Sequence, residues 1–568
     1  MPADVFSCDE SDSFAGIQAA EVHHWPIVRA YAERLGLRAL INRLVPTERA
    51  FEPGLIVLGM LVDTLSGRSP LYHLESFFAE QDTEVLLGER VAPSVFNDDN
   101  VGATLDLLFE TGTQKIYSEV AVAALRAFEV PTDELHFDTT SVSVYGDYLG
   151  SAHEGSPLKI TNGHSKDRRP DLKQFVFSLL CTGGNIPLIG RCEDGNASDK
   201  TLNNTLLSAI SHHLKRIGIQ EQAFTYIADS ALVTEDNLEA LAEGIAFISR
   251  LPATYGECER VIRAAVAANA WSELGRIALS LPTKNRPGAH YRLWDSEVTL
   301  YGKSYRAVVV HSSAHDRRRQ KRLQRELKES EQVLEKQLKS LQKQTFFCHA
   351  DAEAAAAKAR SARSAYHTLE VQVEERPQYA RGRPKKDGTR TVKSVHYGLI
   401  ARVLEDRPVL QQRREQAGCF VLLTNLSTDG EQAYSAAEVL QSYKQQHGIE
   451  QNFGFLKDDA IVNAIFLKSP ARIEALGLIL LLALLIWRLI EQQMRQHLEK
   501  THTTLPGWDN KPTQRPTAYM MTIKFKGLLI LRLGDQRRPA HPLSETRRAF
   551  LNALGLTPEI FTRVPGAG

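Results

Sequence analysis

The stretch "LHFDTTSVSVYG", residues 135 to 146, alternates in polarity and is rich in Thr and Val, which is typical of a β-strand. Two more strand-like stretches follow it, "KQFVFSLLCT" (173 to 182) and "IPLIGRCED" (186 to 194). The residues "GGN" (183 to 185) supply a turn between these two stretches, so they are predicted to pair as a hairpin.

After these strands the sequence alternates between helix and strand patterns. The predicted order is a helix after Ser198, a strand "AFTYIADSA" (223 to 231), a helix from Thr234 to about Glu243 and a strand "AFISRLP" (246 to 252). Strands that alternate with helices predict an α/β fold. A last strand, "GCFVLLTN" (418 to 425), and the helix after it complete this domain, so the residues between 253 and 418 are predicted to be an insertion.

The chain therefore divides into five regions. They are a helical N-terminal domain (1–128), the first part of the α/β domain (129–253), an insertion (254–417), the second part of the α/β domain (418–500) and a C-terminal region (501–568). The N-terminal helices are predicted to bind DNA or to dimerise, and a small packing domain is the alternative interpretation.

The insertion carries two β-like stretches and then two helix patterns, about 314 to 344 and about 350 to 372. The first helix is highly charged and has a heptad-like row of leucines: Leu323, Leu327, Leu334, Leu338 and Leu341. An antiparallel helical hairpin is predicted, with self-association through the leucine row as the alternative. The basic segment "RPQYARGRPKKDGTR" (376 to 390) is predicted to be a loop.

Three carboxylates stand where the interrupted sheet is expected to bring them together. Asp138 lies within the first strand, Asp229 ends the fourth strand, and Glu450 lies on the helix after the last strand. An α/β sheet places functional groups at the carboxyl ends of its strands. Carboxylates without Cys or His partners favour Mg²⁺ or Mn²⁺ over zinc, and two such ions support phosphoryl transfer.

The stretch "YKQQHGIEQNFGFLKDD", residues 443 to 459, is predicted to be a helix. Ser435 and Glu438 fit a capping box at its start, whereas Gly448 is unfavourable in a helix interior. In one continuous helix, residues 446, 450 and 457 would lie within roughly 60° of Tyr443. A polar stripe of this kind is not typical of a core-facing side.

These residues resemble a bacterial insertion-sequence transposase of the DDE type with an RNase H-like catalytic domain. The closest branch carries an insertion before the Glu and a signature Y-(2)-R-(3)-E-(6)-K. That signature maps onto Tyr443, Gln446, Glu450 and Lys457 with every interval kept, and Gln446 replaces the Arg. The two aspartates, together with "GHSKDRRPDLKQ" (163 to 174), "GNASD" (195 to 199) and "FISRLP", also look like this branch, so the similarity runs from about 132 to 490.

The resemblance implies a cut-and-paste transposase. DNA would be cleaved by water at the element's terminal inverted repeats, and a 3′-hydroxyl would then attack target DNA. Asp138, Asp229 and Glu450 would hold two Mg²⁺ ions, which Mn²⁺ can replace. Lys457 would hold a phosphate, with Tyr443 and position 446 assisting. The partners would be double-stranded DNA and further copies of the chain, as a homodimer or higher oligomer in the bacterial cytoplasm.

Two basic segments are candidate DNA contacts, with a solvated loop as the alternative for each. One supplies Lys166, Arg168, Arg169 and Lys173; the other, "RGRPKK", resembles a minor-groove AT-hook and supplies Arg381, Arg383, Lys385 and Lys386. In this branch an aromatic residue of the insertion can also stack on a flipped base. Trp271 and Trp294 are candidates for that role, although core packing is the favoured interpretation of both.

Bulk properties fit a soluble, intracellular protein of 568 residues. Lys plus Arg and Asp plus Glu both number 68, so a DNA-binding signal must be local. The six cysteines form no C-x-x-C pair, and the N-terminus lacks a secretory signal pattern. The apolar run from Ala475 to Trp487 is shorter than the ~20 residues that span a bilayer, so it is predicted to be a core helix.

Competing enzyme classes lack their sequence signatures, since the chain contains no P-loop, no H-E-x-x-H and no G-x-S-x-G. Two alternatives to a transposase remain open at this point. One is an RNase H-like, metal-dependent DNA nuclease without strand transfer, and the other is a non-catalytic DNA-binding relic.

Overall fold

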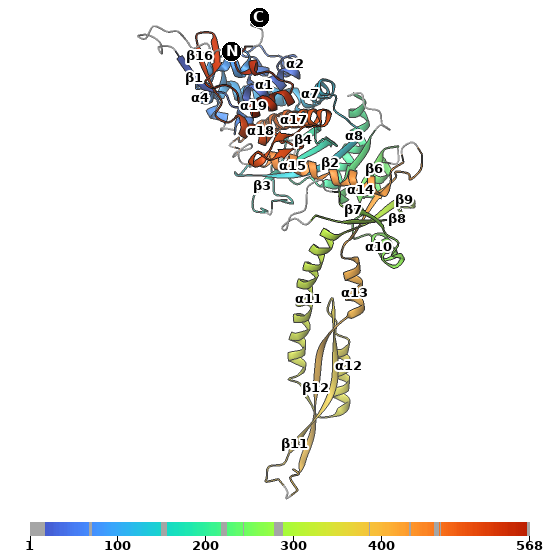
Figure 1. Cartoon of the computed structure of the whole chain (residues 1–568). Coiled ribbons are helices and arrows are strands. Elements are labelled where there is room, and N and C mark those ends of the chain that lie inside the picture. The colour runs from blue at the N-terminus through green and yellow to red at the C-terminus, as the bar shows by residue number, and fades with distance from the viewer. Residues whose placement is uncertain are drawn as a thin grey trace. The chain divides into compact units, whose positions relative to one another are not determined.

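The computed structural model describes residues 17–67, 71–148, 156–167, 169–216, 224–241, 244–277, 288–384, 387–430, 433–458, 465 and 467–564. The chain forms two compact units (Figure 1). Unit 1 comprises Met1–Ser249 and Ser442–Gly568, and unit 2 comprises Arg250–Gln441. All the carboxylates predicted to hold metal belong to unit 1.

Unit 1 begins with a short strand and a series of helices. These are β1 (Ile17–Glu21), α1 (Trp25–Arg34), α2 (Leu37–Leu44), α3 (Pro53–Ser66), α4 (Leu74–Ala79), α5 (Thr83–Leu87), α6 (Asp98–Thr111) and α7 (Thr113–Phe128). The alternating region that follows contains β2 (Glu134–Val144), β3 (Lys173–Thr182), β4 (Pro187–Glu193), α8 (Asp199–Arg216), β5 (Thr225–Ala228), α9 (Glu235–Leu241) and β6 (Ala246–Arg250).

The returning chain supplies α14 (Ala436–Gln445), α15 (His447–Leu456), α17 (Pro470–Thr501), β14 (Leu505–Pro506), β15 (Pro512–Thr513), α18 (Ala518–Phe525), β16 (Leu529–Leu533), β17 (Gln536–Pro539) and α19 (Glu545–Ala553). Strand β1 pairs antiparallel with β16, so the start and the end of the described chain are joined in one small sheet.

The sheet of unit 1 has the strand order β4-β3-β2-β5-β6. The pairs β4–β3 and β3–β2 are antiparallel, whereas β2–β5 and β5–β6 are parallel. Helices α8 and α9 are the connections that a parallel pairing requires. The fold of this unit is therefore mixed α/β, and strands β2 to β6 with helices α8 and α9 lie where the sequence predicts them.

Helix α17 occupies the centre of unit 1. It is long and apolar enough to cross a membrane, but 94% of its most apolar window is buried inside the protein, which is consistent with a soluble protein. A Cβ on Gly190 of β4 would lie 2.8 Å from Leu481 of α17, so the absence of a side chain lets helix and sheet approach closely. The prediction of a buried core helix is confirmed.

The N-terminal helices do not have a core of their own. One continuous hydrophobic core contains Tyr31, Leu61, Tyr117, Leu482 and Phe550, which belong to α1, α3, α7, α17 and α19. The residues on both sides of the insertion therefore fold around the same central helix.

Unit 2 consists of α10 (Gly256–Ala268), β7 (Ser272–Gly275), β8 (Tyr291–Leu300), β9 (Lys303–Ser312), α11 (Ser313–Leu341), β10 (Thr345–Phe346), α12 (His349–Arg360), β11 (His367–Tyr379), β12 (Val392–Glu405), α13 (Arg407–Gln416) and β13 (Cys419–Thr424). Strands β13, β9, β8 and β7 are neighbours in that order, and each pair is antiparallel.

The insertion differs from its prediction beyond residue 360. Helix α12 ends at Arg360, and the last residues of the predicted helix, 367–372, belong to strand β11 of the long antiparallel hairpin β11–β12. The predicted loop begins later than expected, since residues 376–379 are still part of β11, and its described residues from 380 to 390 connect the two strands. Leu334 of the leucine row packs with Leu369 and Leu399 of this hairpin and with alanines of α12. The row is therefore buried within unit 2, which leaves the alternative of self-association through it without support.

Candidate active site

The pairing of β2 with β5 brings the first two predicted carboxylates together. The parallel register sets Phe137 opposite Ala228, so Asp138 and Asp229 come next on adjacent strands, at the point where β5 ends. Asp229 then turns the chain, because its Oδ1 accepts a hydrogen bond of 3.0 Å from the backbone N–H of Ala231. The Ser249 hydroxyl also donates to the Asp229 carbonyl at 2.8 Å.

A third carboxylate beside this pair is Asp199, the first residue of α8. The Thr139 hydroxyl donates to Asp199 Oδ1 at 2.5 Å. This residue escaped the sequence interpretation because an acidic residue at a helix start has a sufficient local explanation. The sequence clue to Asp199 was its position as the last residue of "GNASD" (195 to 199), a segment that the resemblance covered without assigning a role to any single residue.

Lys166 lies among these acids. Its Nζ donates to the carbonyl and hydroxyl oxygens of Thr139 at 2.7 and 2.9 Å, and lies 3.4 Å from Asp199 Oδ2 and 3.7 Å from Asp138 Oδ1. A lysine that was predicted to hold DNA therefore neutralises part of the acidic cluster.

Burial and mutual repulsion disfavour the charged forms of both aspartates. Burial raises the pKa of Asp138 to about 6, and the neighbouring carboxylates of Asp229 and Asp199 add to this, against the opposing effect of Lys166 and the Thr139 backbone. Burial also raises the pKa of Asp229, and Asp199 adds to that shift. Paired acids that resist ionisation are a feature of functional sites.

The predicted helix over 443–459 is two helices, so the expectation of one continuous face is wrong. Helix α14 ends at Gln445 and α15 begins at His447. At the junction the backbone bonds run three residues back, from Gln446 N–H to Tyr443 and from Ile449 N–H to Gln446, which is a tighter turn than an α-helix.

The start of α14 confirms the predicted capping box. The Ser435 N–H donates to Glu438 Oε2 at 2.7 Å, and the Glu438 N–H donates to the Ser435 hydroxyl at 3.3 Å. These two bonds satisfy backbone donors that would otherwise have no partner in the first turn.

A buried polar network fixes α15 against the sheet and α17. Asn452 donates at 3.0 Å to the carbonyl of Asn185, a residue of the β3–β4 turn, and accepts at 2.6 Å from Nε of Arg488. Arg488 in turn forms an ion pair of 2.5 Å with Glu491. A Cβ on Gly448 would collide with the Asn185 amide, so the glycine that weakens the helix prediction is required by this close approach.

Glu450 is on the outer side of α15. Its side chain is 67% exposed, and its Oε2 lies 2.6 Å from Nδ1 of His447. In the part of the chain that the structure describes, no group of three or more His, Cys, Asp and Glu side chains is close enough together to hold a metal ion. The structure thus brings Asp138 and Asp229 together and leaves the Glu450 carboxylate with His447.

The other residues of the predicted signature remain accessible. Lys457, at the end of α15, forms an ion pair of 2.6 Å with Asp167, the neighbour of Lys166. Tyr443 and Gln446 are both half-buried. Lys457 and Lys166, both predicted to contact phosphate, therefore lie near the same loop, because Lys457 pairs with the residue that follows Lys166.

The remaining basic candidates are scattered. Arg169 pairs with Asp171 at 2.7 Å, and Lys173 Nζ donates to the Asp147 carbonyl. In unit 2, Arg381 and Arg383 are exposed. Arg168, Lys385 and Lys386 lie outside the described residues.

Neither tryptophan candidate is a core residue. Trp271 and Trp294 are half-buried in unit 2, and the Arg292 guanidinium lies 5.4 Å from the centre of the Trp271 ring. The favoured sequence interpretation of both as buried core residues is therefore wrong.

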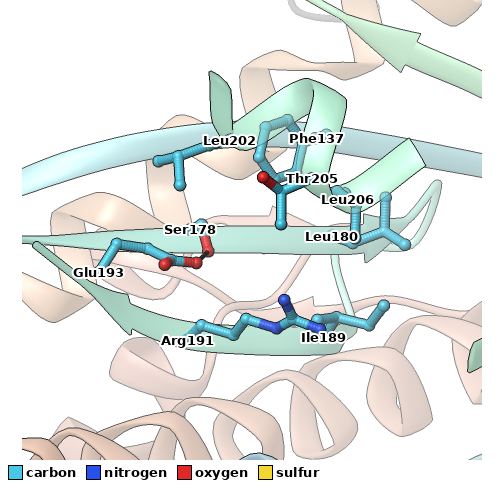
Figure 2. A pocket seen from close by; sticks show the side chains of 9 residues that line it. All are labelled: Phe137, Ser178, Leu180, Ile189, Arg191, Glu193, Leu202, Thr205 and Leu206. Carbon is cyan, nitrogen blue, oxygen red and sulfur yellow. Dashed lines mark hydrogen bonds between the residues drawn. The ribbon is translucent and has the colours of Figure 1, made fainter. Parts of the chain in front are cut away.

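Figure 2 shows a small cavity between α8 and strands β3 and β4. Thr205 of α8 faces Ser178 of β3 across it, and the Ser178 hydroxyl donates to Glu193 at 2.7 Å. Its volume is about 10 Å³, which is room for roughly one water molecule. This cavity is too small to accept a nucleotide.

A comparison with protein families gives a match at the N-terminal end of the chain. A family model described as a domain of unknown function, DUF4277, matches residues 17–122. A search of the curated proteins finds no match to the chain. The matched segment covers α1 to α6 and part of α7, so it contains none of the candidate catalytic residues.

Proposed function

We propose that the chain is a transposase of the DDE type that cleaves and transfers DNA strands at the ends of an insertion sequence. The observation that carries this proposal is the adjacent pair Asp138 and Asp229 at the end of a parallel strand, each with a raised pKa. The mixed sheet, with three antiparallel strands followed by two parallel ones, supports an RNase H-like catalytic domain.

The donor set suits a hard divalent cation. Asp138, Asp229 and the neighbouring Asp199 offer only carboxylate oxygens, which Mg²⁺ and Mn²⁺ prefer. Asp138 and Asp229 would hold the ions, and Glu450 is the third ligand that the resemblance implies. When bound, two such ions supply an activated oxygen nucleophile and stabilise the leaving oxygen of a phosphodiester.

For Glu450 to act as the third metal ligand, its carboxylate must give up its contact with His447. The side chain is exposed, so this rotation would remove few packing contacts. The helix that carries it is already fixed, because Asn452 anchors α15 to the sheet. Lys166 and Lys457 would exchange their present acidic partners for DNA phosphates, for which both ammonium groups suit as point charges.

The natural substrate in this proposal is double-stranded DNA that carries the element's terminal inverted repeats, together with target DNA. The chain would act as a homodimer or higher oligomer in the bacterial cytoplasm. Gln446 would contact the DNA less strongly than the Arg of the signature, because an amide carries no charge.

The test is Mg²⁺-dependent cleavage of a duplex that carries the DNA flanking the gene. Asp138→Ala, Asp229→Ala and Glu450→Gln should each abolish cleavage and leave binding to the end sequence largely intact. Asp236→Ala is a matched control, since this aspartate is exposed on α9. Full cleavage by any of the three variants would refute the assignment.

A second assay separates transposase from nuclease. Precut ends with a free 3′-hydroxyl should join to target DNA in the presence of Mg²⁺. If wild-type protein cuts but never joins, the chain is a metal-dependent nuclease, and if it binds but never cuts, it is a non-catalytic relic. A Gln446→Arg variant of unchanged activity would show that the departure from the signature is harmless.

A further inference from the structure

We propose that a basic face on helix α11 of unit 2 binds the phosphate backbone of double-stranded DNA. This inference rests on the proposed function, since it names a second surface by which the same enzyme holds its substrate. The basic face consists of exposed side chains only: Arg317, Arg318, Arg319, Lys321, Arg322, Arg325 and Lys328.

The basic residues of α11 fall on one side of the helix. At about 100° per residue, six of the seven, all except Arg319, lie within an arc of roughly 140°. Arg317, Lys321, Arg325 and Lys328 form a narrower row within about 80°. At 1.5 Å per residue this row is about 17 Å long.

The opposite side of α11 is buried, so the basic face points outward. Leu323 packs with Tyr366 and Leu410, and Leu327 packs against the same cluster. Leu410 belongs to α13, which therefore lies against α11, and Gln320 also donates to the Arg414 carbonyl at 3.3 Å. Figure 1 shows α13 beside α11 within unit 2, and this contact lies on the side of α11 away from its basic residues.

The charge is concentrated rather than spread along the helix. Residues 313–328 hold seven basic and two acidic side chains. One of the two acids, Glu326, is already paired with Arg322 at 2.6 Å. The distal half of α11 is balanced, since Lys336 and Lys339 stand with Glu329, Glu331 and Glu335.

Duplex DNA is the partner that fits this face. Over about 17 Å of its axis, the length of the basic row on α11, the duplex carries roughly ten phosphate charges. This regular line of charges fits the row better than a single acidic patch on a protein surface would. Most of the face is arginine, which binds phosphate oxygens bidentately. The net charge of the whole chain is zero, so this local excess is not a by-product of overall composition.

The test compares two variants of the full chain with equal loss of charge. One carries Arg318→Gln, Lys321→Gln and Arg325→Gln; the control carries Lys336→Gln, Lys339→Gln and Lys343→Gln, which are exposed on the distal half of α11 and just after it. Binding of a random-sequence duplex is measured by fluorescence anisotropy between 50 and 200 mM salt, without divalent ions so that no cleavage occurs.

The first variant should bind about 10- to 100-fold more weakly at 100 mM salt, with a log K against log salt slope shallower by about 2 to 3. The control should bind like wild type. Equal affinity and slope in the two variants would overturn the proposal and leave an acidic protein surface as the partner class to examine. Unchanged thermal unfolding of the first variant shows that it folds.

The outcome is independent of the catalytic assignment. If wild type never cleaves DNA but the first variant alone loses duplex binding, the proposed function fails and this inference stands. If wild type cleaves and the first variant binds normally, only this inference fails.

Discussion

Replacing Asp138 by Asn should stabilise the metal-free protein at neutral pH. In the folded protein burial raises the pKa of this carboxyl from 3.8 to about 6. The folded state therefore binds the proton more tightly than the unfolded chain does. As pH rises from about 4 to about 6, the unfolded chain releases its proton first, so the free energy of unfolding falls, and above about 6 it stays level. An asparagine has no such proton to lose.

The expected change in the free energy of unfolding follows from the change in the pKa of Asp138. A difference of about 2 pKa units between the folded and unfolded states corresponds to about 3 kcal/mol of stability at most. The Asp138 side chain is still 23% exposed, and solvent screens part of this cost. We therefore expect Asp138→Asn to raise the free energy of unfolding by about 2 kcal/mol at pH 7 and by close to zero at pH 4.

The measurement is thermal unfolding of wild type and Asp138→Asn in chelator at a series of pH values. The difference in Tm should open between pH 4 and 6, and Asp236→Asn, on the exposed face of α9, should show no such change. Mg²⁺ at pH 7 should then raise the Tm of wild type but not of Asp138→Asn, because a ligand that binds only the folded state stabilises it. A variant less stable than wild type by the same amount at every pH would refute the reasoning.

Two further predictions concern the helix that carries Glu450. Gly448→Ala should lower the Tm, because the new methyl group would collide with the Asn185 amide. The control Gly454→Ala places its methyl group in open space on the same helix, so it should leave the stability unchanged or raise it by up to about 1 kcal/mol. Equal changes in Tm for the two variants would contradict this prediction. Asn452→Ala should lower the free energy of unfolding by about 2 to 4 kcal/mol, since it removes buried hydrogen bonds to Arg488 and Asn185. If urea unfolding shows a decrease below about 1 kcal/mol, these hydrogen bonds contribute less to stability than proposed.

Much of the fold was predictable because its signals are local. Strand alternation located β2, β3 and β4, the capping box located the start of α14, and the apolar run located α17. The hairpin β11–β12 was missed although Leu369, Val371 and Val373 alternate with more exposed residues, which is itself a strand pattern. The predicted helix was extended past Arg360 from the alanine-rich segment before it.

The residues of the candidate site also differ in how far local sequence signals predict their positions. Asp138 and Asp229 were predictable because each stands at a definite place on a strand, and a parallel pairing in register then makes them neighbours. Asp199 was missed because only the packing of α8 against β2 brings it to Thr139. By contrast, the exposed Glu450 carboxylate contacts His447, three residues before it, which is a local contact that helical spacing allows.

By itself, then, the sequence determined the α/β pattern, the interrupted domain and the order of the acidic residues, because periodicity, caps and turns act over a few residues. Tertiary structure alone decided three things. They are the break at Gln446, the need for Gly448 and the position of Lys166 among the acids. Each depends on contacts between segments far apart in the chain, where the geometry of one element is set by the surface of another.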